Sequence, residues 1–490
     1  MRNLIATFPR RLGWSMCVFS FAFGIALWSV LQAPPVDVPL EEGLLMKRLL
    51  LMPALLALAV LFLTSACASK APVAIPVAAV APAVPAQPYM AQVVGAQWLN
   101  PLQRRDYPTE WQMLWTLGLA KPNKDDSKVK ENPVRFGKVQ SIGMIASGNN
   151  GRETFNGYHE KYVEELIYLF RDIYFSNKEY FYNAHSLTDK STRRELAGIH
   201  VEYALPAGRL DPDEAGKYVV ETITDAFSIG NPHFPDSWTT ATPPDVRVTM
   251  GGANAGFTSL AAGLAYLQAN PDKTVWVMNW DAPSYPPRDE QINENMVLLV
   301  LAGPGYKTER APLAWLGFPA TRKVADFTAD KGQSPRAVQA WSAAIDAAAR
   351  NAQLNDDAIG YVIHDAGAVY PFSSERIGPL AQSLTQQLPD FDFNKQTFNM
   401  PALLGETGAG TALTNVALAI AYANHVGRPV LVAGSSDSES ATAVVVAPPA
   451  VVRPVDHEQP WFRARGGNTV FLPWWGRRFD ARPGSQGYSR

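Results

Sequence analysis

The sequence predicts an α/β fold built as a duplicated sandwich with two buried central helices. The first observation is a pair of similar stretches, Gly251–Asp281 and Gly405–Asp437, which each begin with a glycine-rich turn and continue as an apolar segment of helical length. The second is that each stretch ends in an apolar strand, with another apolar strand after it. Because a helix that is apolar on nearly every side must be covered on all sides, we expect two similar units packed back to back.

The composition is that of a globular chain without a nucleic-acid or disulfide signature. Of the 490 residues, 47% are hydrophobic and 18% are charged, and the formal net charge is -2, which favours neither disorder nor nucleic-acid binding. The two cysteines, Cys17 and Cys67, both lie in N-terminal apolar segments. The remaining chain therefore has no thiolate nucleophile or cysteine ligand. His159-Glu160 lacks the second histidine of an HExxH zinc site, so we expect no metal and no cofactor.

Two apolar segments near the N-terminus leave the membrane topology open. Gly13–Leu31 is long enough to span a bilayer, and Met46 begins a second segment that resembles a signal sequence ending near Ala66-Cys67-Ala68. Two spans would return the globular part to the cytoplasm. Translation from Met46 followed by cleavage would place it in the periplasm, and an uncleaved segment starting at Met46 would tether it there.

Strand and helix patterns alternate along the rest of the chain, which is typical of the α/β class. In chain order, we expect a strand at 135–148, helices at 158–175 and from Asp211 to about 227, a strand at 245–250, the first buried helix after Gly251, strands at 274–280 and 296–303, a helix at 334–353, a strand at 358–367, a helix at 374–388, the second buried helix after Gly405, and strands at 429–434 and 441–448. Residues 301–333 are expected to be a connection.

These elements divide the chain into five regions. We assign a membrane or signal-like region to 1–68, a linker rich in proline and alanine to 69–95, two similar halves to 96–310 and 311–450, and an extension rich in aromatic residues and arginine to 451–490. Repeated prolines keep the linker extended.

A strand, a glycine turn, a buried helix and two strands, repeated once, resemble the thiolase fold over about 135–449. In the condensing enzymes of that family the first buried helix begins with a nucleophilic cysteine, and this sequence has Ala253 there. His364 resembles one catalytic histidine, whereas Glu406 stands in the place of the second. Acyl transfer on this fold needs a thiolate, and a carboxylate repels the oxyanion that a histidine stabilises. The resemblance therefore implies a degenerate site, formed by Ala253, His364 and Glu406, in a protein that is not an enzyme.

The chain is also similar to a narrower family, the adaptors that accompany phospholipase effectors of type VI secretion in Gram-negative bacteria. The N-terminal apolar region, the aromatic-rich first half and the stretch Asn399–His425 carry this resemblance. It implies an adaptor that binds a lipase effector and presents it to the secretion spike protein, with the globular part on the cytoplasmic side of the inner membrane. Thiolase-like proteins usually pair edge to edge, so a homodimer is a further expectation.

The C-terminal extension contains candidate partner-binding residues. They are tryptophan and arginine side chains that alternate along the segment, namely Trp461, Arg463, Arg465, Trp474 and Trp475. These two residue types are the most enriched at interface hot spots. The alternative is that the aromatic rings cover the thiolase-like core.

Two other functions stay open on the sequence. One is an acyl-thioester-using transferase or hydrolase with a displaced nucleophile, for which Thr258 and Ser259 on the first buried helix are candidates, although no base lies beside them in sequence. The other is a structural protein of the periplasmic envelope, which the signal-like segment from Met46 would favour.

Overall fold

The structure is a computed structural model that describes residues 88–99, 109–120, 130–131, 154–176, 198–233, 242–282, 292–308, 310–367 and 372–455. All of them lie in one compact unit, Pro82–Arg490. Both N-terminal apolar segments, the expected strand at 135–148 and residues 456–490 of the C-terminal extension lie outside the described residues. Within the described ranges, no helix has both the length and the apolar character needed to cross a bilayer.

The two halves contain the same elements in the same order. The first half has β1 (Met90–Leu99), α7 (Phe155–Ser176), β2 (His200–Pro206), α8 (Pro212–Ala226), β3 (Asp245–Gly251), α9 (Ala255–Ala269), β4 (Thr274–Asp281) and β5 (Asn295–Ala302). The second has β6 (Ala314–Gly317), α10 (Arg336–Asn351), β8 (Tyr361–His364), α11 (Phe372–Gln387), β9 (Thr397–Asn399), α13 (Thr411–Val426), β10 (Val430–Gly434) and β11 (Ser440–Ala447). Short elements add α4 (Thr109–Thr116), β7 (Ala320–Lys323), η3 (Val324–Asp326), η4 (Asp356–Ala358), α12 (Met400–Leu404) and η5 (Gly408–Gly410).

The strand order confirms the predicted duplication. The strands follow the order β3-β2-β4-β5-β1 in the first half and β9-β8-β10-β11-β6 in the second, so each of these strands has a counterpart at the same place; β7, which pairs with β11, has none among the described strands. In both halves the first three strands of this order are parallel and the fourth is antiparallel to them. Strands β1 and β6 pair antiparallel and join the halves into one sheet. The chain therefore has a mixed α/β fold made of two matching units.

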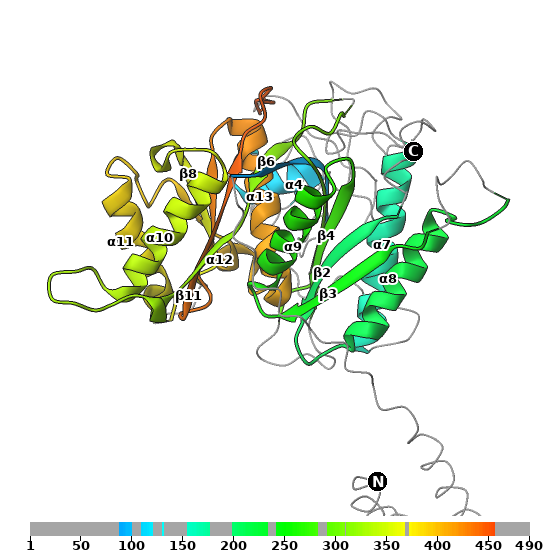
Figure 1. The fold of residues 1–490 in the computed structure, drawn as a ribbon, viewed down its shortest axis with the longest axis horizontal. Coiled ribbons are helices and arrows are strands. Elements are labelled where there is room, and N and C mark those ends of the chain that lie inside the picture. Colours follow the sequence, from blue (N-terminus) through cyan, green and yellow to red (C-terminus); the bar gives the residue numbers. More distant parts are fainter. Residues whose placement is uncertain are drawn as a thin grey trace, which may run out of the picture. The chain divides into compact units, whose positions relative to one another are not determined.

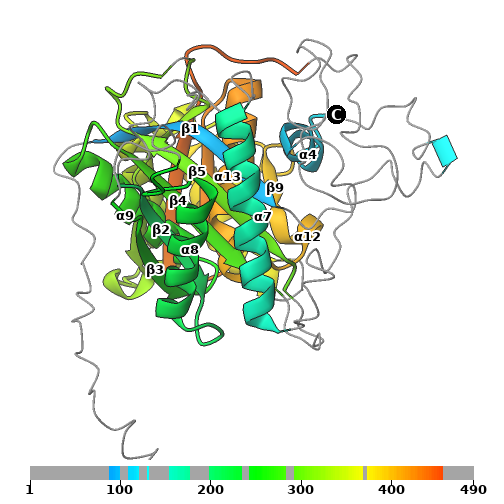
Figure 2. The same cartoon turned by 90° about the vertical axis from the view of Figure 1, so that its right-hand side faces the viewer.

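The helices cover the sheet in layers, which Figure 1 shows from one side. Helices α7 and α8 pack on the outer face of the first half, α10 and α11 on the outer face of the second, and α9 and α13 lie between the halves. Figure 2 shows α7 and α8 crossing in front of β2, β4 and β5. The central pair is therefore the part of the core that both halves share.

The two central helices differ in how fully they are covered. In α13 every residue except Tyr422 and Val426 is buried, which confirms the prediction for this helix. In α9 the side chains of Thr258, Ala265 and Gln268 are exposed on one face. The prediction of burial on all sides is wrong for that face, because Thr258 and Gln268 are polar side chains that need no covering and Ala265 carries little apolar surface.

Several strands were not expected from the sequence. Strand β1 begins at Met90, inside the range 69–95 that was predicted to be a linker, and β6 and β7 lie in the predicted connection 301–333. Strand β1 pairs with β5 and β6 and is buried along almost its whole length, so its residues do not alternate between polar and apolar. Strands of four residues, such as β6 and β7, are too short to show a period.

Gly256 sets the distance between the central helices. A Cβ atom on Gly256 would lie 3.0 Å from the Cβ of Ala412 and 3.2 Å from the Cγ of Leu413. Because one partner is a backbone-fixed methyl group, added volume must move a helix. Interiors are packed as densely as organic crystals, so such a movement has a cost.

We predict that Gly256→Leu lowers the free energy of unfolding by about 1–3 kcal/mol, because it overpacks the contact between α9 and α13. The control is Gly252→Leu, four positions earlier, where a Cβ would meet nothing within 4 Å and the change is expected to stay within about 0.5 kcal/mol. Urea unfolding of the two variants measures the difference. Equal stability of both variants would contradict the tight helix contact.

Candidate functional site

The three expected site residues come from segments at one end of the sheet. Ala253 lies in the turn between β3 and α9, His364 is the last residue of β8, and Glu406 lies between α12 and η5. Ala253 precedes the central helix α9, Glu406 precedes the central helix α13, and β8 pairs in parallel with β10, the strand that follows α13. Their side chains, however, do not converge in the way that the resemblance implied.

The start of α9 touches the second half at the end of β10. A Cβ on Gly434 would collide with Asn254 Oδ1 and would lie 2.7 Å from Phe257 Cε2. Glycine is therefore required at this end of β10 for the first half to approach. Asn254, the neighbour of Ala253, thus lies against the end of β10, directly before Ser435 and Ser436.

Asp365, which the sequence interpretation did not single out, is the central carboxylate of this region. Its Oδ1 accepts hydrogen bonds from Ser435 N at 2.5 Å, Ser435 Oγ at 3.0 Å and Ser436 N at 3.2 Å. Its Oδ2 is buried and has no hydrogen-bond partner among the described residues. Burial raises the pKa of Asp365, and the hydrogen bonds from Ser435 and Ser436 oppose this rise.

Glu406 belongs to the same group of charges. A Cβ on Gly367 would lie 3.3 Å from Glu406 Oε1 and 3.6 Å from Arg376 Nη1, which places the three residues side by side. Burial raises the pKa of Glu406, the charge of Asp365 raises it further, and Arg376 lowers it. The main chain of this turn is fixed by Asn293, whose N–H donates to Glu406 O at 2.7 Å.

His364 points away from this group of charges. Alternate residues of a strand face opposite sides of the sheet. Val362 packs with the outer cluster of α10 and α11, and Ile363 packs in the central core. The His364 ring stacks on Phe393, which packs against that same outer cluster, at 6.2 Å between ring centres. Burial lowers the pKa of His364 to about 4, so the ring is neutral at physiological pH.

The structure thus brings Glu406 together with Asp365 and Arg376, and it brings Ala253 to the nearby end of β10. Among the described residues, no hydrogen bond, ion pair or ring contact joins His364 to Glu406 or Ala253. Two carboxylates and an arginine form an acidic site that would repel an oxyanion. The sequence did carry a signal for Asp365, because a residue that follows His364 along a strand faces the opposite side.

The alternative nucleophiles on α9 have no activating base beside them in the described part of the chain. Ser259 is fully buried, and its Oγ has no hydrogen-bond partner there. Thr258 is exposed on the outer face of the helix. A serine or threonine hydroxyl is a weak nucleophile without an adjacent base. The candidate partner-binding residues Trp461, Arg463, Arg465, Trp474 and Trp475 lie outside the described residues.

A buried carboxylate holds the turn between α12 and η5, which we call the Glu406 turn, against the first half. Asp281 Oδ1, at the end of β4, accepts from Arg209 Nη1 at 2.7 Å, and its Oδ2 accepts from Ala409 N at 2.9 Å. Arg209 also lies over the Phe155 ring, 3.7 Å from its centre. Burial raises the pKa of Asp281 to about 6, although Ala409 and Arg209 both act to lower it. A Cβ on Gly408 would collide with this carboxylate.

Comparison with known proteins identifies the second half. Residues 313–448 match the family model described as Type VI lipase adapter protein Tla3, C-terminal. This match confirms, for that part of the chain, the resemblance to the type VI lipase adaptor family. No curated protein matches the chain.

Several of the solved structures similar to the chain are ketosynthases. One is the oxazolomycin ketosynthase domain OzmH KS8 of Streptomyces albus JA3453, with 12% identity, 78% of this chain and 100% of that chain covered, and a TM-score of 0.43. Another is the ketosynthase from module 6 of the bacillaene synthase of Bacillus subtilis 168, with 10% identity, 73% and 72% covered, and a TM-score of 0.48. A third, from module 1 of the bacillaene synthase of Bacillus amyloliquefaciens FZB42, has 10% identity, 75% and 74% covered, and a TM-score of 0.44.

The Asp281 ion pair predicts a pH-dependent stability. The pKa of Asp281 in the folded protein, about 6, lies above its ordinary value of 3.8, so the folded state binds more protons than the unfolded state between these values. The contribution of Asp281 to stability therefore falls as pH rises through this window. Arg209→Gln removes the cation that stabilises the ionised carboxylate of Asp281 and so limits the fall in stability at high pH. We expect a cost of roughly 3 kcal/mol at pH 8, where the carboxylate is ionised, and a smaller cost at pH 5.

Urea unfolding at both pH values tests this prediction, and Arg209→Lys is the control that keeps the charge. The lysine variant should retain most of the stability at pH 8. A loss in Arg209→Gln that is the same at pH 5 and pH 8 would show that Arg209 acts only through its packing on Phe155.

Proposed function

We propose that this protein is a non-catalytic adaptor that binds a phospholipase-type effector and loads it onto the spike protein of a type VI secretion system. The observation that carries the proposal is the match of residues 313–448 to the type VI lipase adapter model. This range contains β8, the Glu406 turn and α13, so the family resemblance covers the half in which the acidic site lies.

The absence of catalysis is supported by the chemistry of the degenerate site. Ala253 has no group that could be acylated, and acyl transfer needs a nucleophile that holds the acyl group. Glu406 and Asp365 place negative charge where the resemblance would require an imidazole. His364 is turned toward Phe393 on the outer face. We therefore assign these three positions a structural role in the adaptor.

Two further properties are part of the proposal. Loading onto a spike requires the globular part on the cytoplasmic side of the inner membrane, which protease accessibility in spheroplasts compared with lysed cells would test. A homodimer is supported by β3, which lies at the end of the sheet and pairs only with β2 among the described strands. An unpaired edge is a template for a second strand. Light scattering of the purified chain measures the oligomeric state.

The adaptor function predicts which proteins the tagged full chain captures from the native bacterium. We expect recovery of a lipase and of a spike protein, identified by mass spectrometry. If the C-terminal extension binds the effector, replacing both Trp474 and Trp475 by alanine should lower lipase recovery at least about tenfold, since interface tryptophans are frequent hot spots. The control is Tyr168→Ala on α7, an aromatic side chain that is 37% exposed and should have no effect.

Two other outcomes would have different consequences for this assignment. Unchanged lipase recovery by the tryptophan variant would exclude the extension as the binding segment while leaving the adaptor function in place. Recovery of an acyl carrier in place of a lipase and a spike protein, together with covalent labelling of the chain by a reactive acyl thioester, would instead favour the alternative of a transferase or hydrolase.

A further inference from the structure

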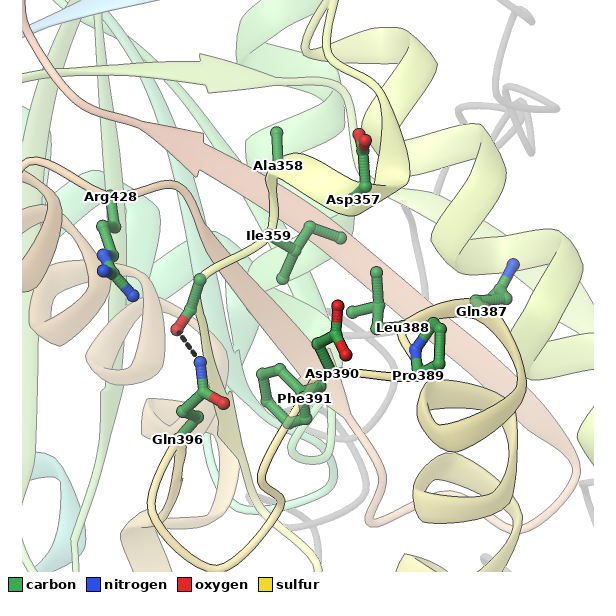
Figure 3. A pocket seen from close by; sticks show the side chains of 11 residues that line it. Asp357, Ala358, Ile359, Gln387, Leu388, Pro389, Asp390, Phe391, Gln396 and Arg428 are labelled. Atoms are coloured by element: carbon green, nitrogen blue, oxygen red, sulfur yellow. Dashed lines mark hydrogen bonds between the residues drawn. The ribbon is translucent and has the colours of Figure 1, made fainter.

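A second feature of the matched range is a pocket at the opposite end of β8 from Asp365. Its volume is about 350 Å³, and it lies between η4, the end of α11 and Arg428, which follows α13. Figure 3 shows the side chains around it. With about 3.3 Å per strand residue, the four residues of β8 separate the pocket from the acidic site by roughly 13 Å. We call it the Arg428 pocket.

The base of the Arg428 pocket is apolar. Ile359 and Leu388 line it and are 4% and 6% exposed, and the partly buried Phe391 lies beside them. All three belong to or pack against the outer cluster of α10 and α11, so they are held by the core of the second half. A preformed apolar base of this size can receive one large side chain.

The rim carries unpaired charges of opposite sign on opposite sides. Figure 3 shows Arg428 on one side, and Asp390 and Asp357 toward the other, with Ile359 between them. The stem of Arg428 packs against Gly360, where a Cβ would lie 2.8 Å from Arg428 Cδ. Arg428, Asp357 and Asp390 are exposed, and in the described part of the chain none of their charged groups makes an ion pair or hydrogen bond.

The acidic side is reinforced by neighbours beneath the rim. The pKa of Asp356 is raised to about 6 by burial, by a hydrogen bond with Asp346 and by the charges of Asp346 and Asp357, while Arg350 lowers it. These carboxyl groups repel one another, and a cation bound beside Asp357 would relieve that repulsion. The rim therefore favours a basic group on this side and an acidic group near Arg428.

We propose that the Arg428 pocket is a docking site for the effector, and that it receives a segment in which an apolar side chain lies between an acidic and a basic residue. This inference rests on the proposed function. The acidic residue would pair with the Arg428 guanidinium, because an arginine can bind a carboxylate through two parallel hydrogen bonds. The basic residue would pair with Asp357 and Asp390. The charge pattern fixes the direction of the segment as well as its identity.

The neighbouring strand offers a way to align such a segment. Gln396 donates from Nε2 to Gly360 O at 3.1 Å at the border of the pocket (Figure 3) and leads directly into β9. Strand β9 ends the sheet and, among the described strands, pairs only with β8. Main-chain groups on an open edge can bind an extended peptide whose side chain enters an adjacent pocket. A protein segment therefore fits this surface better than a small molecule does.

The test uses the full chain in the native bacterium with the photo-reactive residue p-benzoylphenylalanine in place of Asp357. The control places the same residue at Arg336, an exposed position at the start of α10. The helix is about 22 Å long, and the chain reaches Asp357 only after the far end of it. We expect a covalent adduct with the lipase from position 357 and none from position 336. In parallel, Arg428→Glu should lower lipase recovery at least tenfold, while Arg336→Glu, which places an acidic residue at a helix start, should leave it unchanged.

The outcomes separate this inference from the proposed function. If the unmodified chain captures the lipase but position 357 gives no lipase adduct and Arg428→Glu retains recovery, the pocket is not the docking site and the adaptor function stands. If the unmodified chain captures no lipase and position 357 links to a different protein, the effector is excluded as the occupant and the adaptor function fails with it. Absence of both capture and adduct overturns both. The urea midpoint of Arg428→Glu shows whether the variant is folded.

Discussion

The arrangement of the two halves depends on one buried carboxylate, that of Asp281. It ends β4 of the first half and binds both Arg209 and the N–H of Ala409, which lies in η5 directly before α13. An anion is favoured at such a position because the first turn of a helix has free N–H groups. Burying a charge is costly unless it is paired, so the bonds of Asp281 to Arg209 and Ala409 favour the observed position of the turn that contains Glu406. Gly408 leaves the space that it needs.

Under the proposed adaptor function, this constraint would maintain the fold without the acyl-transfer chemistry of the condensing enzymes that the sequence resembles. Gly256 joins α9 to α13 through its contact with Ala412, and Asp281 joins β4 to η5, directly before α13. Neither interaction uses Ala253, His364 or Glu406. Both interactions contribute to packing, so a protein without catalytic activity would still need them. The Asp365 hydrogen bonds to Ser435 and Ser436 likewise connect β8 with the turn between β10 and β11. The site is held by interactions that a binding protein requires as much as an enzyme does.

The sequence predicted the features that repeat with a period, and it missed those that depend on pairing. The duplicated units and the burial of α13 follow from long apolar segments between glycine turns. Strand β1 was missed because a strand buried on both faces shows no alternation. The direction of His364 could have been found, since Val362 and His364 share one face of β8, but the motif resemblance placed it by position alone. The bonds of Asp281 to Arg209 and Ala409 could not have been found, because the partners are far apart in sequence.

Strand β8 carries two different charge environments at its two ends. At one end Asp365 is buried, and hydrogen bonds from Ser435 and Ser436 partly offset its burial, whereas the exposed Glu406 lies beside Arg376. At the other end Asp357, Asp390 and Arg428 are exposed. Buried charges that are paired within a protein contribute to its internal geometry, whereas exposed charges that are not paired are available to a partner. The distribution of charge along β8 therefore supports the proposed recognition role of the Arg428 pocket, while the buried carboxylate of Asp365 contributes to the internal geometry of the other end.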